Sequence, residues 1–218
     1  MRQLARPLAI ALLAGTALLG AAAAFHPMLA GDAAAQLRLI AATPHWRTIH
    51  LVMLIGSGLV IVGLWARVTL DPAGASAPML AALATIAIGI AINALDVAFM
   101  AGAGWQMAAR FEGGQTETMS TLFAVTHPIG RMFARFGNFI VALGALLLGW
   151  LEWQDAATPR WVAALAWLAA AGGFVGALFF DEASPAVLAA VALLSAWQAA
   201  TALRALRAPA VASGSARR

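Results

Sequence analysis

The chain has 218 residues, of which 63% are hydrophobic and only 10% are charged. Soluble domains carry about 25% charged residues, so this composition indicates an integral membrane protein. Cysteine and lysine are absent, which excludes disulfides, thiolate metal sites, cysteine nucleophiles and Schiff-base chemistry. The net charge of +4 comes from scattered arginines without a basic, aromatic-interleaved stripe, so no nucleic-acid partner is expected.

Six apolar stretches are long enough to cross a hydrocarbon core, which takes about 20 helical residues. Their expected bounds are 7–24, 47–66, 79–101, 132–151, 161–180 and 186–206. All nine prolines fall at or between the ends of these stretches, as expected for a residue that interrupts helices. In lipid the backbone must satisfy its own hydrogen bonds, so the sequence predicts an all-α, polytopic bundle of six transmembrane helices. Residues 1–206 would form this single domain, and 207–218 a disordered cytoplasmic tail.

The first stretch has a second interpretation. Arg2 and Arg6, the apolar run and the small residues that follow also describe a signal peptide, cleaved after Ala24. We favour a retained helix, because 7–24 is long for the apolar core of a signal peptide. Both alternatives leave His26 on the same side of the membrane.

The distribution of arginine predicts that both termini are cytoplasmic. In that orientation eight arginines lie in inner segments and five in outer ones, and inner segments of membrane proteins are enriched in basic residues. Abundant alanine and arginine without lysine is typical of GC-rich bacterial coding, so we expect a bacterial inner-membrane protein.

One outer segment, 102–131, is predicted to be a long loop. It contains the pair Gly113-Gly114, and Thr116–Thr126 is expected to form a short amphipathic helix at the outer interface. Long loops in compact proteins are often functional, so this segment is a candidate lid.

All four histidines fall at the outer edge of the predicted bundle. His26 ends the first stretch, His45 and His50 open the second, and His127 opens the fourth. Neutral imidazole is a common ligand of metals and haem, so all four are candidate metal ligands. His45 and His50 are five residues apart and point to different helix faces, so His45 and Trp46 are equally well explained as interfacial anchors.

Polar residues on the third and fourth stretches are expected to face each other. The fourth stretch carries a stripe at i, i+4, i+8 and i+11: His127, Arg131, Arg135 and Asn138. Asn93 and Asp96 form a matching face on the third. Arginine inside a membrane is costly unless it has a partner, so we expect an ion pair between Asp96 and Arg135. Alternatively, the arginines and a histidine receive an anionic group such as a haem propionate or a lipid phosphate.

Two functional classes fit this pattern, and the sequence contains no recognised catalytic motif. The first is an outward-facing His/Arg pocket for haem b or a divalent metal, with these candidate residues: His50, His26, His127, Arg131 and Arg135. The second is a non-catalytic accessory or structural membrane protein whose polar residues lock helices or bind a lipid or small anionic solute. Small-residue faces, such as Gly172 and Gly176, favour close packing with a membrane-protein partner or a second copy.

Overall fold

The described part of the chain is almost entirely helical. The computed structural model describes residues 2–70, 75–179 and 185–207, and no strand occurs among them. Six helices there are long and apolar enough to cross a membrane, which confirms the predicted all-α bundle. They are α1 (Ala5–Phe25), α3 (Trp46–Gly63), α4 (Ala77–Phe99), α6 (Thr116–Gln154), α7 (Arg160–Phe179) and α8 (Pro185–Arg207). The predicted disordered tail lies outside the described residues, apart from Arg207.

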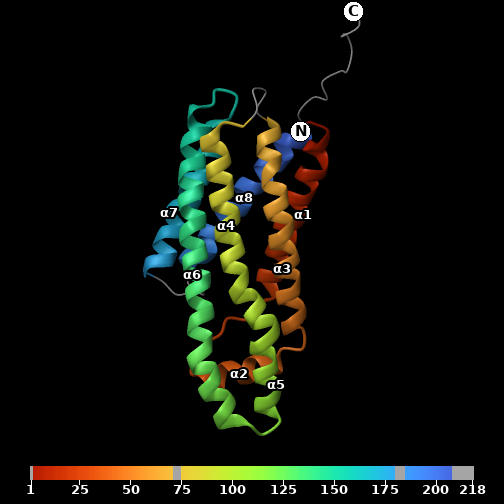
Figure 1. Cartoon of the computed structure of the whole chain (residues 1–218), viewed down its shortest axis with the longest axis vertical. Coiled ribbons are helices and arrows are strands. Elements are labelled where there is room, and N and C mark those ends of the chain that lie inside the picture. The colour runs from red at the N-terminus through yellow and green to blue at the C-terminus, as the bar shows by residue number, and fades with distance from the viewer. Residues whose placement is uncertain (1, 71–74, 180–184, 208–218) are drawn as a thin grey trace, which may run out of the picture.

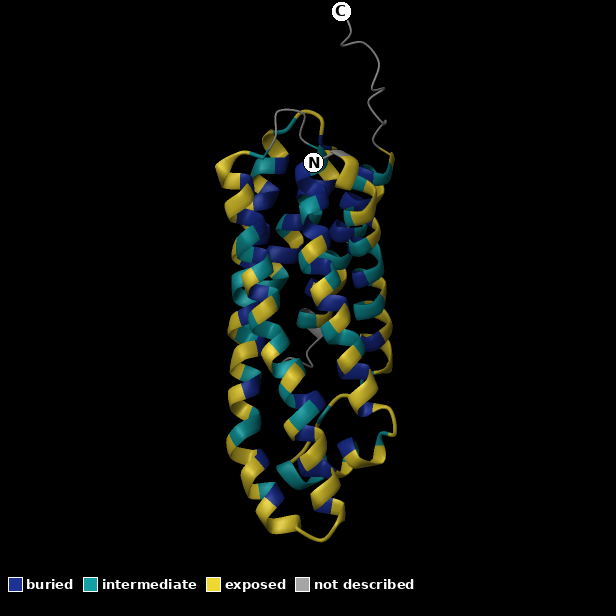
Figure 2. Cartoon of the chain, turned by 45° about the vertical axis from the view of Figure 1, so that its right-hand side comes forward, coloured by how far each residue is buried: buried dark blue, intermediate teal, exposed yellow. Residues whose placement is uncertain are grey.

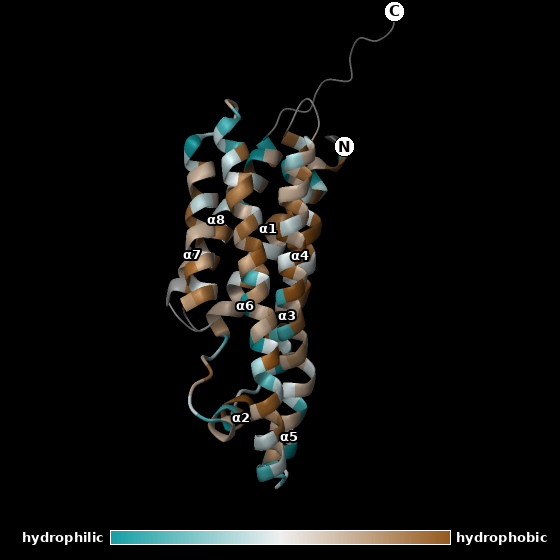
Figure 3. Ribbon diagram, turned by 60° about the vertical axis from the view of Figure 1, so that its left-hand side comes forward, coloured by the Kyte–Doolittle hydropathy of each residue, from teal (hydrophilic) through white to brown (hydrophobic). Residues whose placement is uncertain are grey.

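The long helices run side by side along one axis (Figure 1). The start of α1 and the end of α8 lie at the same end of the bundle, here called the termini end. The opposite end carries two short helices, α2 (Ala33–Ala42) and α5 (Trp105–Glu112), and is called the histidine end. Buried residues line the inside of the bundle and exposed ones its outer faces (Figure 2). Apolar residues dominate the long helices, and hydrophilic ones are more frequent toward both ends (Figure 3).

Residues 102–131 are mostly helical, unlike the long loop expected from the sequence. α4 continues through a π-helical turn, Met100–Gly104, directly into α5. α6 begins at Thr116, after a turn in which Gly114 has a φ of 97°, a left-handed conformation that favours glycine. The predicted short helix at Thr116–Thr126 is therefore the first part of α6, and the hairpin of α5 and α6 extends past the other long helices, with α2 beside it (Figure 1).

The hairpin is helical because its apolar residues form a small core of their own. Met107 and Phe111 of α5 pack in one cluster with Met119 and Phe123 of α6 and with α2. This packing keeps α6 helical on both sides of Pro128, which lies inside the helix rather than before its start. The glycine and proline content of 102–131 therefore led to the wrong prediction of a loop, because tertiary packing overrides the local helix propensity here. Its role as a lid stays a prediction.

Glycines let neighbouring helices touch backbone to backbone. A Cβ added at Gly89 of α4 would lie 2.6 Å from the amide nitrogen of Val141 in α6, and Gly137 of α6 approaches α4 equally closely. Gly172 and Gly176 of α7 pack against α8. The small-residue face of α7, which was expected to pack against a partner, therefore packs against α8 of the same chain.

Candidate functional site

Two of the four histidines meet at the histidine end. His26 is the C-cap of α1 and adopts an extended conformation before Pro27, and His50 is buried one turn inside α3. Their Nε2 atoms are 3.2 Å apart and their rings are steeply inclined, at 67°. The structure thus joins two of the predicted ligands into a histidine pair (His26 and His50) that links α1 to α3.

The hydrogen bonds of the histidine pair indicate where its protons lie. His50 Nδ1 is 2.8 Å from the Trp46 carbonyl oxygen, which only accepts, so Nδ1 carries a proton. In neutral His50, Nε2 is then an acceptor that faces His26 Nε2. Burial lowers the pKa of His26, and a hydrogen bond with the Pro27 backbone offsets part of this effect. Proline has no N–H, so His26 is the donor in its bond with Pro27. With both rings neutral, the two Nε2 atoms therefore face each other without a proton between them, and a bridging proton would give the pair one positive charge.

Trp46 holds the histidine pair in place. Its ring centroid lies 5.0 Å from that of His26 and 4.5 Å from that of His50. Its indole N–H donates to the Met100 carbonyl at 3.1 Å, at the start of the π-helical turn, a form often found at functional sites. The side chain is fully buried, so the interfacial anchor considered for Trp46 is wrong. The sequence contained a clue to this contact, because Trp46 and His50 are four residues apart and therefore lie on one face of the helix.

His45 and His127 have different surroundings. His45 is exposed and lines an open groove of about 470 Å³ between α1 and α3, together with Phe25. His127 stacks against the rings of Phe99 and Phe123, at centroid distances of 6.5 and 4.5 Å. Among the described residues, no group of three or more His, Asp or Glu side chains is placed to hold one metal ion. The structure therefore does not gather all four predicted metal ligands around one point.

The polar stripes of α4 and α6 face each other. Asn93 Nδ2 donates to Asn138 Oδ1 at 3.2 Å. The Asp96 carboxylate lies directly against Gly130, in space that a Cβ would fill. Asp96 thus faces α6, while its ion pair with Arg135 stays a prediction. The same is true of an anionic group bound by the arginines of the stripe.

The termini end contains a buried ion pair that was not foreseen from the sequence. Arg67, in the 3-10 turn Leu64–Leu70 (η2) that follows α3, is only 2% exposed. Its Nε lies 3.0 Å from Oε1 of the fully buried Glu152 in α6. The indole N–H of Trp197 in α8 donates to the other oxygen, Oε2, at 2.9 Å. The available clue was a carboxylate directly after the apolar stretch 132–151, where a buried charge is costly unless it is paired.

Asp155 extends this cluster to the edge of the bundle. It accepts hydrogen bonds from Arg67 at 3.4 Å, from Thr158 Oγ1 at 2.7 Å and from the Ala157 amide at 2.9 Å. Burial alone would raise the pKa of Asp155, but these hydrogen bonds and the charges of Arg67 and Arg204 outweigh it and lower the pKa. Arg204 of α8 also donates to Thr158 at 3.0 Å, so the cluster ties α8 to the turn after α6.

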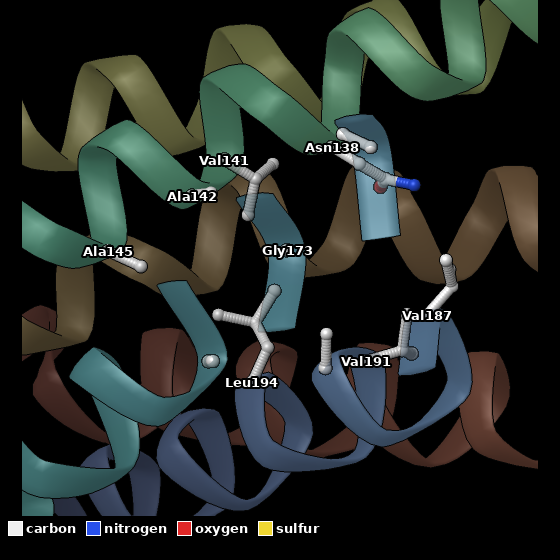
Figure 4. Close-up of a pocket in the computed structure, with 11 residues that line it drawn as sticks. Asn138, Val141, Ala142, Ala145, Gly173, Val187, Val191 and Leu194 are labelled. Atoms are coloured by element: carbon white, nitrogen blue, oxygen red, sulfur yellow. The ribbon is translucent and has the colours of Figure 1, made fainter. Parts of the chain in front are cut away.

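A small cavity lies between α6, α7 and α8 (Figure 4). Its volume is about 30 Å³, and small apolar residues line it with Asn138 as the one polar side chain. A space of this size holds about one water molecule. The cavity is therefore a packing gap beside the Asn93–Asn138 contact and not a substrate site.

No family model matches the chain, and neither a curated protein nor a solved structure is similar to it. The site has to be interpreted from its own geometry.

Proposed function

We propose that this multipass membrane protein binds one divalent transition-metal ion between His26 and His50. The observation that carries the proposal is the 3.2 Å separation of the two Nε2 atoms. Metal–imidazole bonds of about 2.0–2.1 Å that diverge by roughly 100° place two nitrogen ligands at this separation. The alternative is a simple N–H···N hydrogen bond that clasps α1 to α3.

The surroundings of His50 are those of a metal-binding imidazole. Its Nδ1–H is held by the Trp46 carbonyl, and such a bond commonly fixes the tautomer and orientation of a metal ligand. Two imidazoles without a thiolate suit Zn²⁺, Cu²⁺ or Ni²⁺ better than Ca²⁺ or Mg²⁺, which prefer oxygen ligands. Water or a small ligand would complete the coordination, as in open metal sites.

The same distance argues against haem between His26 and His50. Two axial imidazoles bind the iron from opposite faces of the macrocycle, whereas these two rings are in direct contact, with centroids 4.9 Å apart. Haem held by His50 with His127, and with its propionates at Arg131 and Arg135, stays a prediction. A Soret band in the visible spectrum of the purified protein would support it.

Titration of the purified protein with Zn²⁺ tests the metal proposal. Calorimetry should give one site, and His26→Gln or His50→Gln should each weaken binding by about 10-fold or more. His45→Gln is the matched control, because His45 opens the same helix but is exposed and outside the pair. Its affinity should match that of the parent. A parent without a Zn²⁺ site, or equal losses in all three variants, would leave the pair as a hydrogen-bonded clasp.

A second candidate is a non-catalytic accessory protein whose polar residues lock its helices. The Asn93–Asn138 hydrogen bond and the Arg67–Glu152 ion pair favour it, because each joins separate elements inside the bundle. A ligand that binds the folded state raises the melting temperature. Metal binding therefore predicts that Zn²⁺ raises the melting temperature of the parent and not of His50→Gln, whereas simple helix locking predicts no Zn²⁺ effect.

For the orientation, we infer that both termini lie in the bacterial cytoplasm and that the histidine end faces outward. The eight-to-five arginine bias supports this, and so does the common position of the start of α1 and the end of α8 (Figure 1). A reporter fused after Arg38 should read outside and one fused after Arg218 inside. The reverse pattern would place the histidine pair on the cytoplasmic side.

A further inference from the structure

The outward face of α6 carries a regular apolar pattern that the bundle does not use. Five large side chains follow at spacings of three, four, three and four residues and are 46–64% exposed: Leu122, Val125, Ile129, Met132 and Phe136. This alternation is the a/d pattern of a helix that packs against another helix in a left-handed coiled coil.

The pattern continues without interruption to the end of the helix. The next positions in the same alternation are Phe139, Leu143, Leu146, Trp150 and Trp153. Phe139 is half-buried, and the other four are more than 40% exposed. All ten positions from Leu122 to Trp153, here called the α6 seam, are apolar or aromatic.

The seam points away from the neighbouring helices. Other faces of α6 make the close contacts with α4 and α7, through Gly130, Gly137, Gly144, Ala142 and Gly149. Of the seam residues, Phe139 and Trp153 also touch aromatic rings of α7, at the edge of the seam. The greater part of the seam is therefore open to a further helix.

The bilayer is too thin to cover the whole seam. α6 has 39 residues, so it is about 58 Å long, against about 30 Å for a hydrocarbon core. Gly173, near the end of α7, packs at Ala142 of α6, so Leu122 and Val125 lie well past the end of α7. Large apolar side chains exposed beyond the bilayer are unfavourable and mark interaction surfaces.

We propose that the α6 seam packs in parallel against the α6 seam of a second copy of this chain. Two copies inserted in one bilayer share their direction, so a twofold axis along the membrane normal sets each seam residue against its counterpart. A uniformly apolar seam without charges is complementary to itself. Nine partly exposed side chains of this size bury on the order of 800 Å² per copy, which is the size of a standard specific interface.

Cysteine cross-linking tests this arrangement, and the chain suits it because it has no cysteine of its own. Val125→Cys, Ile129→Cys and Met132→Cys should each give a disulfide-linked dimer under mild oxidation in membranes. Ala124→Cys is the matched control, since Ala124 is exposed but lies off the seam, and it should stay at background. Equal yields at all four positions, or no dimer at the seam positions, would overturn the parallel dimer.

Native mass spectrometry in detergent gives a second readout that does not depend on cysteine geometry. The parent should have twice the 22.4 kDa mass of one chain. Ile129→Glu should have the mass of one chain, because it sets two carboxylates against each other. Ile129 is 55% exposed, so the helical fold should persist, as far-UV circular dichroism checks. A single-chain parent whose seam cysteines stay unlinked would assign the seam to lipid or to a different protein. None of these outcomes depends on metal binding.

Discussion

The histidine end and the termini end of the bundle bury polar groups in different ways. At both ends a buried indole N–H donates a hydrogen bond beside the polar cluster. Trp46 donates to the Met100 carbonyl at 3.1 Å, and Trp197 donates to the Glu152 carboxylate at 2.9 Å. At the histidine end the neighbouring groups are imidazoles, which need no counter-ion when neutral. At the termini end a carboxylate is matched by the guanidinium of Arg67, 3.0 Å away.

This difference separates a centre that can accept a ligand from one that cannot. Both oxygens of Glu152 already have donors, so a ligand would have to displace a buried ion pair. The Nε2 atoms of His26 and His50 face each other at 3.2 Å, and an imidazole nitrogen can bind a metal ion in place of a proton. The proposed metal site therefore lies at the histidine end, while the termini end fixes α6 and α8 relative to η2.

Breaking the charge pair should give the largest loss of stability. Arg67→Met leaves the buried Glu152 carboxylate without its counter-charge, which costs about 3–5 kcal/mol. The free energy of unfolding in detergent should fall by this amount. Arg67→Met combined with Glu152→Gln should recover much of the loss, because it leaves no uncompensated charge. A double variant no more stable than Arg67→Met would show that the cluster stabilises through packing and not through charge.

The two tryptophans provide a matched pair of variants. Trp197→Phe removes a hydrogen bond to a charged group, worth about 1.5–3 kcal/mol, and Trp46→Phe removes one to a neutral carbonyl, worth about 0.5–1.5 kcal/mol. Both residues are almost fully buried, at 1% and 0% exposure, so the lost ring volume is comparable. The difference between the losses of unfolding free energy in the two variants then reports how much the charge of the Glu152 carboxylate adds to the hydrogen bond. Equal losses would remove the distinction between the two ends.

The six spans could be predicted because apolar length and proline spacing are local properties of the chain. The hairpin could not, because Gly113, Gly114 and Pro128 lower helix propensity locally. What stabilises it there is the packing of Phe111 and Phe123 in one cluster, a contact between two helices. Local propensity is therefore a good guide to the bundle and a poor one to the segment that extends past it.

The candidate site could be predicted only in part, for a related reason. His26 and His50 were both candidates from their common edge, but the contact between them depends on how α1 packs against α3. Arg67 and Glu152 are 85 residues apart. An arginine near the end of a span ordinarily reaches the interface with its long side chain, so its sequence position cannot distinguish a buried arginine from an interfacial one.

A single added methyl group tests how tightly Asp96 of the polar stripe is held against α6. Gly130→Ala places this group where the Asp96 carboxylate lies, so the carboxylate has to move, at a cost of about 1–3 kcal/mol. Gly20→Ala is the control, because nothing lies within 4 Å of its added Cβ, and alanine should stabilise that helix by roughly 0.5–1 kcal/mol. A similar gain in both variants would show that Asp96 is not held tightly against α6.

The smallest expected effect is acid sensitivity at the termini end. Burial raises the pKa of Asp155, but its hydrogen bonds and the nearby arginines lower it overall, below the ordinary value of 3.8. Ionised Asp155 therefore favours the folded state, fully above pH 3.8, and this contribution is lost as pH falls through the lowered pKa. Asp155→Asn lacks the contribution at every pH. Its deficit in melting temperature relative to the parent should be largest at neutral pH and shrink in acid.

Two threonine variants show whether the hydrogen bonds of Asp155 cause this behaviour. Thr158→Val removes the 2.7 Å hydrogen bond to the carboxylate, so the folded pKa should rise and the stabilisation should be lost at a higher pH than in the parent. Thr126→Val removes a hydroxyl that donates to the Leu122 carbonyl one turn earlier in the same helix, and this variant should follow the parent at every pH. If Asp155→Asn instead differs from the parent by a constant amount down to the most acidic pH, the carboxylate of Asp155 adds no linked stability. The charge compensation that distinguishes the termini end would then rest on Arg67 and Glu152 alone.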